Sequence, residues 1–188
     1  MPRKKRLVAP NTFYHVFNRG VAKMPIVTDD MDRKAFFKCL GESIRENDAD
    51  ILAYCLMDNH FHLLLRTKTA NLPKLMWKHL SQYVRRYNHR HNRVGPLFQS
   101  RYKDKIISSD AYALQALRYI HLNPVKDGLT ERCEDYPWSS YACYLGLLPR
   151  WPWLNTEFFL KLFHSDPQTA QDTFARFHDS GITEDYQF

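Results

Sequence analysis

Two histidines separated by one residue, His60 and His62, are the first side chains whose types and spacing suggest chemistry. They lie in an apolar stretch that runs from residue 51 to residue 65. Residues two apart on a β-strand point to the same side, so both imidazoles would project from one face of a sheet. Such a pair alone often only hydrogen-bonds at a sheet edge. The spacing therefore predicts a metal site only if a further ligand lies opposite.

Tyr119 and Asn123 offer that second half of a site. They stand one helical turn apart, about 40° from each other around a helix and away from the apolar stripe of residues 113–120. Docked across a sheet face, this helix would place the tyrosine beside a metal held by His60, His62 and the Asn123 amide oxygen. Neutral imidazoles with a hard oxygen suit Mg²⁺ or Mn²⁺ at a phosphate, and zinc is a further option. Taken alone, Tyr119 reads equally well as a packed tyrosine with its hydroxyl at the rim.

A second histidine pair with the same spacing, His89 and His91, falls in a helical pattern. Residues two apart on a helix diverge by about 200°, so these rings do not converge. We expect both histidines to be solvated or to face phosphates.

The hydrophobic periodicity predicts the order β, α, β, β, α, β, α. Helices are expected to begin after Thr28-Asp29, near Leu72, and after Ser108 or Ser109. The last of them should end at Asn123, because Pro124 disfavours the helical conformation there. The expected strands span residues 12–18, 51–57, 61–67 and 98–107. This order predicts an α+β, ferredoxin-like antiparallel sheet with two helices on one face and the tyrosine helix across the open face.

The charge of the chain is unevenly distributed. The formal net charge is +7, with −3 in residues 147–188 and +10 in residues 1–146, and eleven Lys or Arg residues lie between Arg66 and Lys105. This pattern is typical of a nucleic-acid binder, although a solvated basic face is the simpler alternative. Trp77 or Tyr102 are candidates for stacking on unpaired bases. The candidate phosphate contacts are Arg3, Lys4, Lys5, Arg6, Lys74, Lys78, Arg85, Arg101, Lys103 and Lys105.

Length and composition indicate one domain with a tail. We divide the 188 residues into a basic N-terminal arm (1–10), a main domain (11–146) and an acidic, aromatic C-terminal extension (147–188) whose role the sequence does not indicate. The four cysteines form no CxxC pair and are expected to be reduced structural thiols. No apolar run reaches the roughly 18 residues of a membrane span, so we expect a cytoplasmic protein without a membrane partner.

Several separated motifs resemble a known family. The segment Leu56–Leu64, which contains His60-Phe61-His62, resembles the HUH motif of single-tyrosine transposases of the insertion-sequence type. Further motifs resemble the domesticated branch, the REP-associated tyrosine transposases: Asn18-Arg19-Gly20, Gly95–Gln99, Arg118–Lys126 and Tyr136–Tyr141. The resemblance runs from about Asn11 to Gly146 and does not include the C-terminal extension.

The resemblance implies a metal-dependent endonuclease and strand transferase. Its substrate would be single-stranded DNA folded into short hairpins, the repetitive extragenic palindromes, and its intermediate a 5′-phosphotyrosine. Tyr119 would be the nucleophile and His60 and His62 the metal ligands, while Asn123 stands where mobile relatives carry glutamine. Arg19 joins the candidate DNA contacts, and Asp58 is either a second-shell acceptor for a histidine or a turn residue.

The family also implies a divalent metal, Mg²⁺ or Mn²⁺, no small-molecule cofactor, a bacterial nucleoid-associated location, and a monomer or homodimer. Two alternatives stay open at this point. One is a non-catalytic regulator that binds hairpin nucleic acid on a ferredoxin-like sheet. The other is a metal nuclease that hydrolyses with water and leaves Tyr119 incidental.

Overall fold

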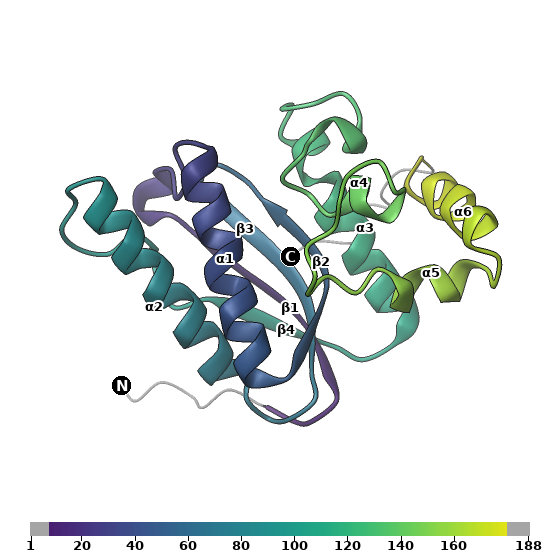
Figure 1. Cartoon of the computed structure of the whole chain (residues 1–188), viewed down its shortest axis with the longest axis horizontal. Coiled ribbons are helices and arrows are strands. Elements are labelled where there is room, and N and C mark those ends of the chain that lie inside the picture. Colours follow the sequence, from purple (N-terminus) through teal and green to yellow (C-terminus); the bar gives the residue numbers. More distant parts are fainter. Residues whose placement is uncertain (1–7, 180–188) are drawn as a thin grey trace.

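A four-stranded antiparallel sheet lies at the centre of the structure, a computed structural model that describes residues 8–179 (Figure 1). Its strands β1 (Thr12–Arg19), β2 (Ala49–Leu56), β3 (His60–Thr67) and β4 (Lys103–Ile107) are arranged in the order β2-β3-β1-β4. The longest helices are α1 (Asp30–Asn47), α2 (Leu72–Arg90) and α3 (Asp110–Lys126). Shorter helices are η1 (Val21–Lys23), η2 (Cys133–Asp135), α4 (Tyr141–Tyr144), α5 (Glu157–Phe163) and α6 (Pro167–Asp179). The predicted ferredoxin-like α+β fold is confirmed.

Local signals set the helix starts and the hairpin. The Asp29 carboxylate accepts a hydrogen bond from the Asp32 amide and caps α1, and the Ser109 hydroxyl does the same for α3. The β2–β3 hairpin closes where the Met57 amide donates to the His60 carbonyl at 2.9 Å. No helix in the described part of the chain is long and apolar enough to cross a membrane.

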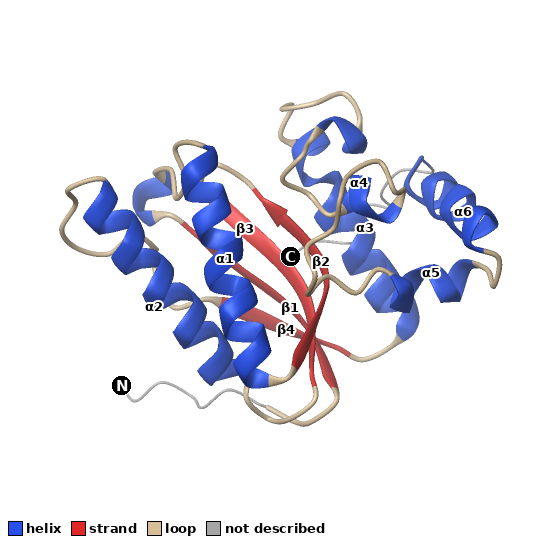
Figure 2. Cartoon of the chain, viewed as in Figure 1, coloured by secondary structure: helices blue, strands red, loops and turns tan. Residues whose placement is uncertain are grey.

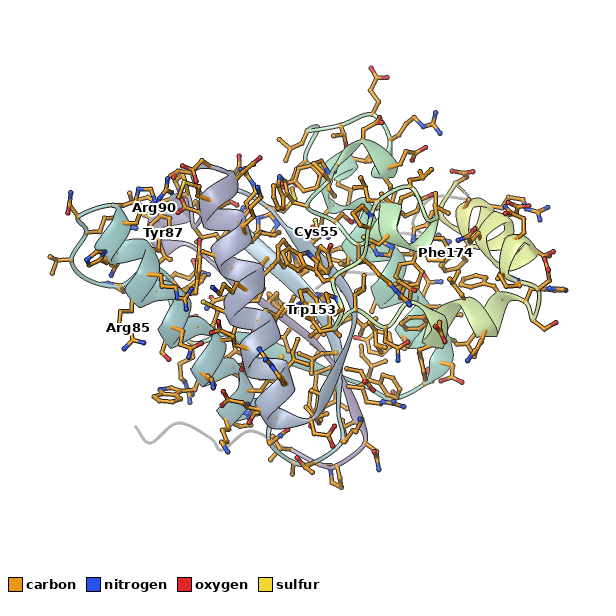
Figure 3. The ribbon with its side chains drawn as sticks, viewed as in Figure 1. Cys55, Arg85, Tyr87, Arg90, Trp153 and Phe174 are labelled. Atoms are coloured by element: carbon orange, nitrogen blue, oxygen red, sulfur yellow. The ribbon has the colours of Figure 1, made fainter. Side chains whose placement is uncertain are left out.

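Helices lie on both sides of the sheet (Figure 2), and each face of the sheet has its own hydrophobic core. Leu63 points toward α1 and α2 and is buried with Phe36, whereas its neighbour Leu64 points the other way and is buried with Leu117 of α3. Phe159 and Phe174, from the predicted C-terminal extension, are fully buried in the second core, and Figure 3 labels Phe174 on α6. The extension therefore packs on the face that the sequence left open beside α3.

The fourth strand is shorter than predicted. It begins at Lys103 rather than at residue 98, and Phe98 forms only an isolated bridge with Gly20. The Phe98 and Tyr102 side chains both pack into the core under α2. The intervening chain bends so that the Gln99 amide donates to the Arg19 carbonyl at 3.0 Å. Burial of two aromatic rings on one side thus overrides the strand propensity of this segment.

His79 on α2 is a buried histidine whose ring nitrogens have no hydrogen-bond partner among the described residues. It packs edge-on against Phe36, and burial lowers its pKa to about 3. Unfolded histidine titrates near 6.5, so below that pH the unfolded chain binds a proton that the folded chain refuses. The free energy of unfolding is therefore not reduced by protonation at His79 above pH 6.5, and it decreases as the pH drops from 6.5 toward 3.

His79→Leu is therefore expected to stabilise the protein by about 1–3 kcal/mol at pH 7, because it removes unsatisfied buried nitrogens. It should also reduce the loss of stability between pH 6.5 and pH 5 by up to about 1.4 kcal/mol per pH unit. Denaturant unfolding at pH 7 and pH 5 measures both effects. The exposed His89→Leu is the control. Parallel pH profiles for wild type and His79→Leu would contradict this interpretation.

Candidate active site

The two histidines of β3 project from the same face of the sheet, as predicted. Their ring centroids lie 5.2 Å apart, and their planes are nearly perpendicular. Phe61, between them, points to the opposite face and is buried in the core under α1 and α2. In the sheet, His60 pairs with Arg19 and His62 with Phe17 of β1. The two-residue period of the strand thus places both imidazoles side by side on one face of the sheet.

Hydrogen bonds orient each ring of the pair. The His60 Nδ1 lies 2.6 Å from the Asn59 amide oxygen, so Nδ1 donates and Nε2 keeps its lone pair. The His62 Nδ1 lies 2.8 Å from the Nε2 of His15 on β1, and the tautomer in which His62 donates this bond has a lone pair on the His62 Nε2. Burial lowers the pKa of both histidines, which favours neutral rings. Two oriented, neutral imidazoles result.

Asp58 does not contact a histidine. Its carboxylate forms an ion pair with Arg33 at 2.6 Å, and its carbonyl accepts from the amides of Ile26 and Val27. Of the two roles considered for Asp58, the structure shows the turn residue. The histidine acceptor is its neighbour, Asn59.

Helix α3 brings Tyr119 to the histidine pair. The Tyr119 ring centroid lies 5.5 Å from that of His62 and 6.0 Å from that of His15. Burial, followed by the charge of Asp127, raises the pKa of the Tyr119 hydroxyl. The Lys126 ammonium lies 4.6 Å from the centre of the same ring. The tyrosine is therefore protonated at neutral pH and held at the edge of the histidine cluster.

The tyrosine helix does not end at Asn123, contrary to the prediction. It continues through Pro124 to Lys126. Proline has no amide hydrogen for the Ile120 carbonyl, but the Asn123 side-chain nitrogen donates to the Tyr119 carbonyl at 2.8 Å and approaches the Ile120 carbonyl at 3.4 Å. This replacement lets the helix pass the proline.

The same bonds orient the Asn123 amide. Since its nitrogen is committed to the helix backbone, its oxygen is the atom available to the histidines. A protonated His60 Nε2 would donate to this oxygen, and that interaction partly offsets the lowering of the His60 pKa by burial. The structure thus brings together all four residues predicted to form the site.

A polar cavity of about 310 Å³ lies in front of these side chains. Residues that the sequence did not single out for the site also line it or stand behind it: Phe17, Asn18, Gln99 and Asp127 line the cavity, and His15 supports His62. The only sequence signal for His15 was its position on the same strand face as Phe13 and Phe17. That signal becomes meaningful only once β1 is known to pair with β3, which the residue pattern does not reveal.

Three of the predicted basic residues lie on the cavity side of the sheet. Arg19 and Lys103 line the cavity. Lys105 pairs with His15 in the β1–β4 register, so its side chain leaves the sheet on the same face. Two cations and one acidic residue, Asp127, thus line the cavity, and Lys105 lies further along the same face of the sheet.

The other predicted basic residues lie elsewhere. Lys74, Lys78 and Arg85 stand on α2, beyond the opposite face of the sheet, and Lys78 forms an ion pair with Glu46 of α1. Arg101 and Arg85 line a separate groove. Arg3, Lys4, Lys5 and Arg6 lie outside the described residues. The structure therefore does not gather all the predicted contacts around one cavity.

The second histidine pair does not converge, as predicted, but its environment differs from the expectation. His89 is exposed, whereas the His91 Nε2 lies 2.9 Å from the buried Asp32 carboxylate. Arg90 bonds to the same carboxylate at 2.6 Å. His91 and Arg90 thus connect the end of α2 to the start of α1, with the His91 ring partly buried and Arg90 still exposed.

A directed chain of hydrogen bonds fixes α3 between the sheet and α6. The Nδ1 of His178 donates to the Phe174 carbonyl (2.9 Å), so its Nε2 accepts from the Nδ1 of His121 on α3 (3.0 Å). The His121 Nε2 then accepts from the Ser140 hydroxyl (2.7 Å), which itself accepts from the Tyr54 amide of β2 (3.0 Å). All these groups are buried. The C-terminal helix therefore helps to hold the helix that carries Tyr119.

The donors at the cavity fit a divalent metal. His60 and His62 present nitrogen lone pairs and Asn123 a carbonyl oxygen, and each histidine has an outer hydrogen-bond partner of the kind that orients metal ligands. Within residues 8–179, no group of three or more His, Cys, Asp or Glu side chains is placed to hold a metal. A metal here would depend on the two imidazoles, the amide, and oxygen atoms from water or a phosphate.

The structure thus combines a ferredoxin-like sheet, two histidines on one of its faces and a helix with a tyrosine across that face. The chain belongs to the IS200-like transposase family, because the model of that family, "Transposase IS200 like", matches residues 9–123. The family consists of DNA-processing transposases, so the chain is related to DNA-processing enzymes.

Two individual comparisons agree with this assignment. A protein of Haemophilus influenzae, provisionally named a REP-associated tyrosine transposase, is 28% identical over 103 residues, which cover 49% of this chain and 58% of that protein. The match thus spans little more than half of that relative's length. A solved structure of a REP-associated tyrosine transposase bound to a REP hairpin matches with a TM-score of 0.63 at 18% identity, over 79% of this chain and 89% of the other. At this identity the match supports the fold.

Proposed function

We propose that this protein is a metal-dependent endonuclease and strand transferase that acts on single-stranded DNA folded into a hairpin. The observation that carries the proposal is the position of Tyr119, whose ring lies 5.5 Å from that of His62 at the mouth of a cation-lined cavity. The hairpin in the structural relative supports the substrate class. The proposal includes a location at the bacterial nucleoid, where the protein would meet such hairpins in the chromosome.

In this proposal Tyr119 is the nucleophile. Its hydroxyl is protonated at neutral pH, and burial raises its pKa further, so it is a weak nucleophile by itself. His60, His62 and Asn123 would hold a divalent metal, which would supply the positive charge that polarises the scissile phosphate and offsets its developing charge. Arg19 and Lys103 bind the flanking phosphates, which orients the backbone for in-line attack.

The exchange conserves the number of phosphodiester bonds. The Tyr119 oxygen bonds to phosphorus and loses its proton, while the bond from phosphorus to the 3′ oxygen breaks and that oxygen takes up a proton. The products are a 5′-phosphotyrosine and a free 3′-OH. Because one ester replaces another, a second 3′-OH can reverse or redirect the reaction without ATP. This property separates strand transfer from hydrolysis.

End-labelled DNA tests the proposal against both alternatives. A hairpin with a single-stranded flank and Mg²⁺ or Mn²⁺ is expected to give protein attached covalently to the 5′ end of one fragment and an extendable 3′-OH on the other. A nuclease that uses water would leave both fragments free of protein. A non-catalytic hairpin binder would leave the DNA intact, so each alternative gives a different set of products.

A further inference from the structure

A second groove, on the α2 side of the sheet, contains an exposed tryptophan. The Trp77 side chain is 72% exposed to solvent. The groove has a volume of about 620 Å³ and is mainly apolar. Met76, Leu80 and Phe98 form much of its wall. An exposed ring that continues an apolar groove forms a contiguous apolar patch, and such patches mark ligand-binding grooves and interaction sites.

The charge along this groove has one sign. Arg85 and Arg101 line it, and Figure 3 shows Arg85 projecting away from α2. Lys74 lines the neighbouring hollow that Trp77 and Arg85 share, where the acidic Glu46 is paired with Lys78. Of the described residues that line the groove itself, none is acidic. Apolar walls with cationic edges are complementary to nucleotide bases and their phosphates.

The groove and the active-site cavity share one wall. Asn18 lines both of them, and its side-chain nitrogen donates to the Ser100 carbonyl at 3.0 Å. Along the same segment, Gln99 and Lys103 face the cavity, whereas Ser100 and Arg101 face the groove. Residues 99–103 are therefore a ridge that a strand leaving the cavity can cross into the groove.

We infer that this groove binds an unpaired base of the single-stranded DNA flank, with Trp77 as the stacking platform and Arg85 and Arg101 as phosphate contacts. The inference rests on the proposed function for the nature of the ligand and adds a subsite outside the cavity. Stacking suits this role because every base offers a flat face, so the contact tolerates different sequences. A protein partner, or a second copy of the chain, is the competing occupant of an apolar groove. The wall shared with the cavity and the absence of acidic side chains along the groove favour DNA.

The test compares DNA binding with and without the flank. Binding of the full chain is measured in the absence of divalent metal with a hairpin that carries a single-stranded flank and with the same hairpin without it. Trp77→Ala is expected to weaken binding of the flanked hairpin by about 5- to 150-fold, the range for loss of one base–aromatic stack, and to leave the blunt hairpin unchanged. Trp77→Phe should retain most of the affinity. An abasic flank should reduce wild-type affinity to the level of the alanine variant.

Leu147→Ala, at another exposed apolar residue, is the matched control, and thermal unfolding checks that each variant is folded. Equal affinities of wild type and Trp77→Ala for the flanked DNA would overturn the inference, as would an equal loss on both DNAs. A change in oligomeric state without a change in DNA binding would assign the groove to a second copy instead. The binding result is independent of catalysis. If Trp77→Ala binds like wild type and the wild type forms a covalent adduct, only the groove inference is rejected. If Trp77→Ala loses affinity but the wild type forms no adduct, only the proposed chemistry is rejected.

Discussion

Tyr119→Phe is expected to abolish formation of the covalent protein–DNA adduct and to reduce strand cleavage by at least about a thousandfold. Phenylalanine keeps the ring that packs beside His62 and His15 but removes the oxygen that would bond to phosphorus. The fold and the hairpin affinity should therefore remain. Denaturing gels of labelled flanked hairpin, run with and without protease treatment, measure both cleavage and adduct.

The matched control for this variant is Tyr112→Phe. Tyr112 lies two turns earlier on α3 and is likewise partly buried, but it does not line the cavity. Tyr112→Phe should cleave the DNA and form the covalent adduct like wild type. If Tyr119→Phe cleaves as fast as Tyr112→Phe, water is the nucleophile and the tyrosine mechanism is wrong.

The second large effect concerns the histidine pair. His60→Ala is expected to reduce cleavage by more than about a hundredfold, because loss of even an outer-shell partner of a metal ligand commonly costs 10- to 100-fold. Hairpin affinity measured without metal should change little, since phosphate contacts by the basic residues dominate binding. Cleavage rates across a range of Mg²⁺ and Mn²⁺ concentrations, compared with binding curves, separate the two properties.

His62→Gln tests the other ligand with a smaller disturbance, because His62 is buried against His15. His89→Ala removes a histidine from the other pair, whose ring is exposed and does not line the cavity. It should keep full activity. Equal losses in His60→Ala and His89→Ala would show that the cavity histidines have no special role.

Features that depend on neighbouring residues were predictable from the sequence. Asp29 and Ser109 mark the starts of two helices because their side chains bond to amides three residues later. The alternation of His60, Phe61 and His62 is sufficient to assign one face of a strand to the site and the other to the core. Tyr119 and Asn123 were placed together because a helical turn separates them.

Features set by particular side-chain contacts, most of them between residues far apart in the sequence, were not predictable. The Asn123 amide compensates Pro124 and lets α3 continue, which the rule for residues before proline does not anticipate. Phe98 and Tyr102 leave the strand pattern because α2 covers both rings. The C-terminal helix supports α3 through His178 and His121, a contact across 57 residues. Such pairings become visible only when the chain is folded.

The clearest test of the whole account is to identify the amino acid that carries the DNA. After reaction with flanked hairpin and Mg²⁺ or Mn²⁺, the adduct is digested with protease and nuclease, and the modified peptide is sequenced by mass spectrometry. The account predicts a nucleotide joined through its 5′-phosphate to Tyr119. A nucleotide on another residue, or cleaved DNA with no modified peptide, would contradict it.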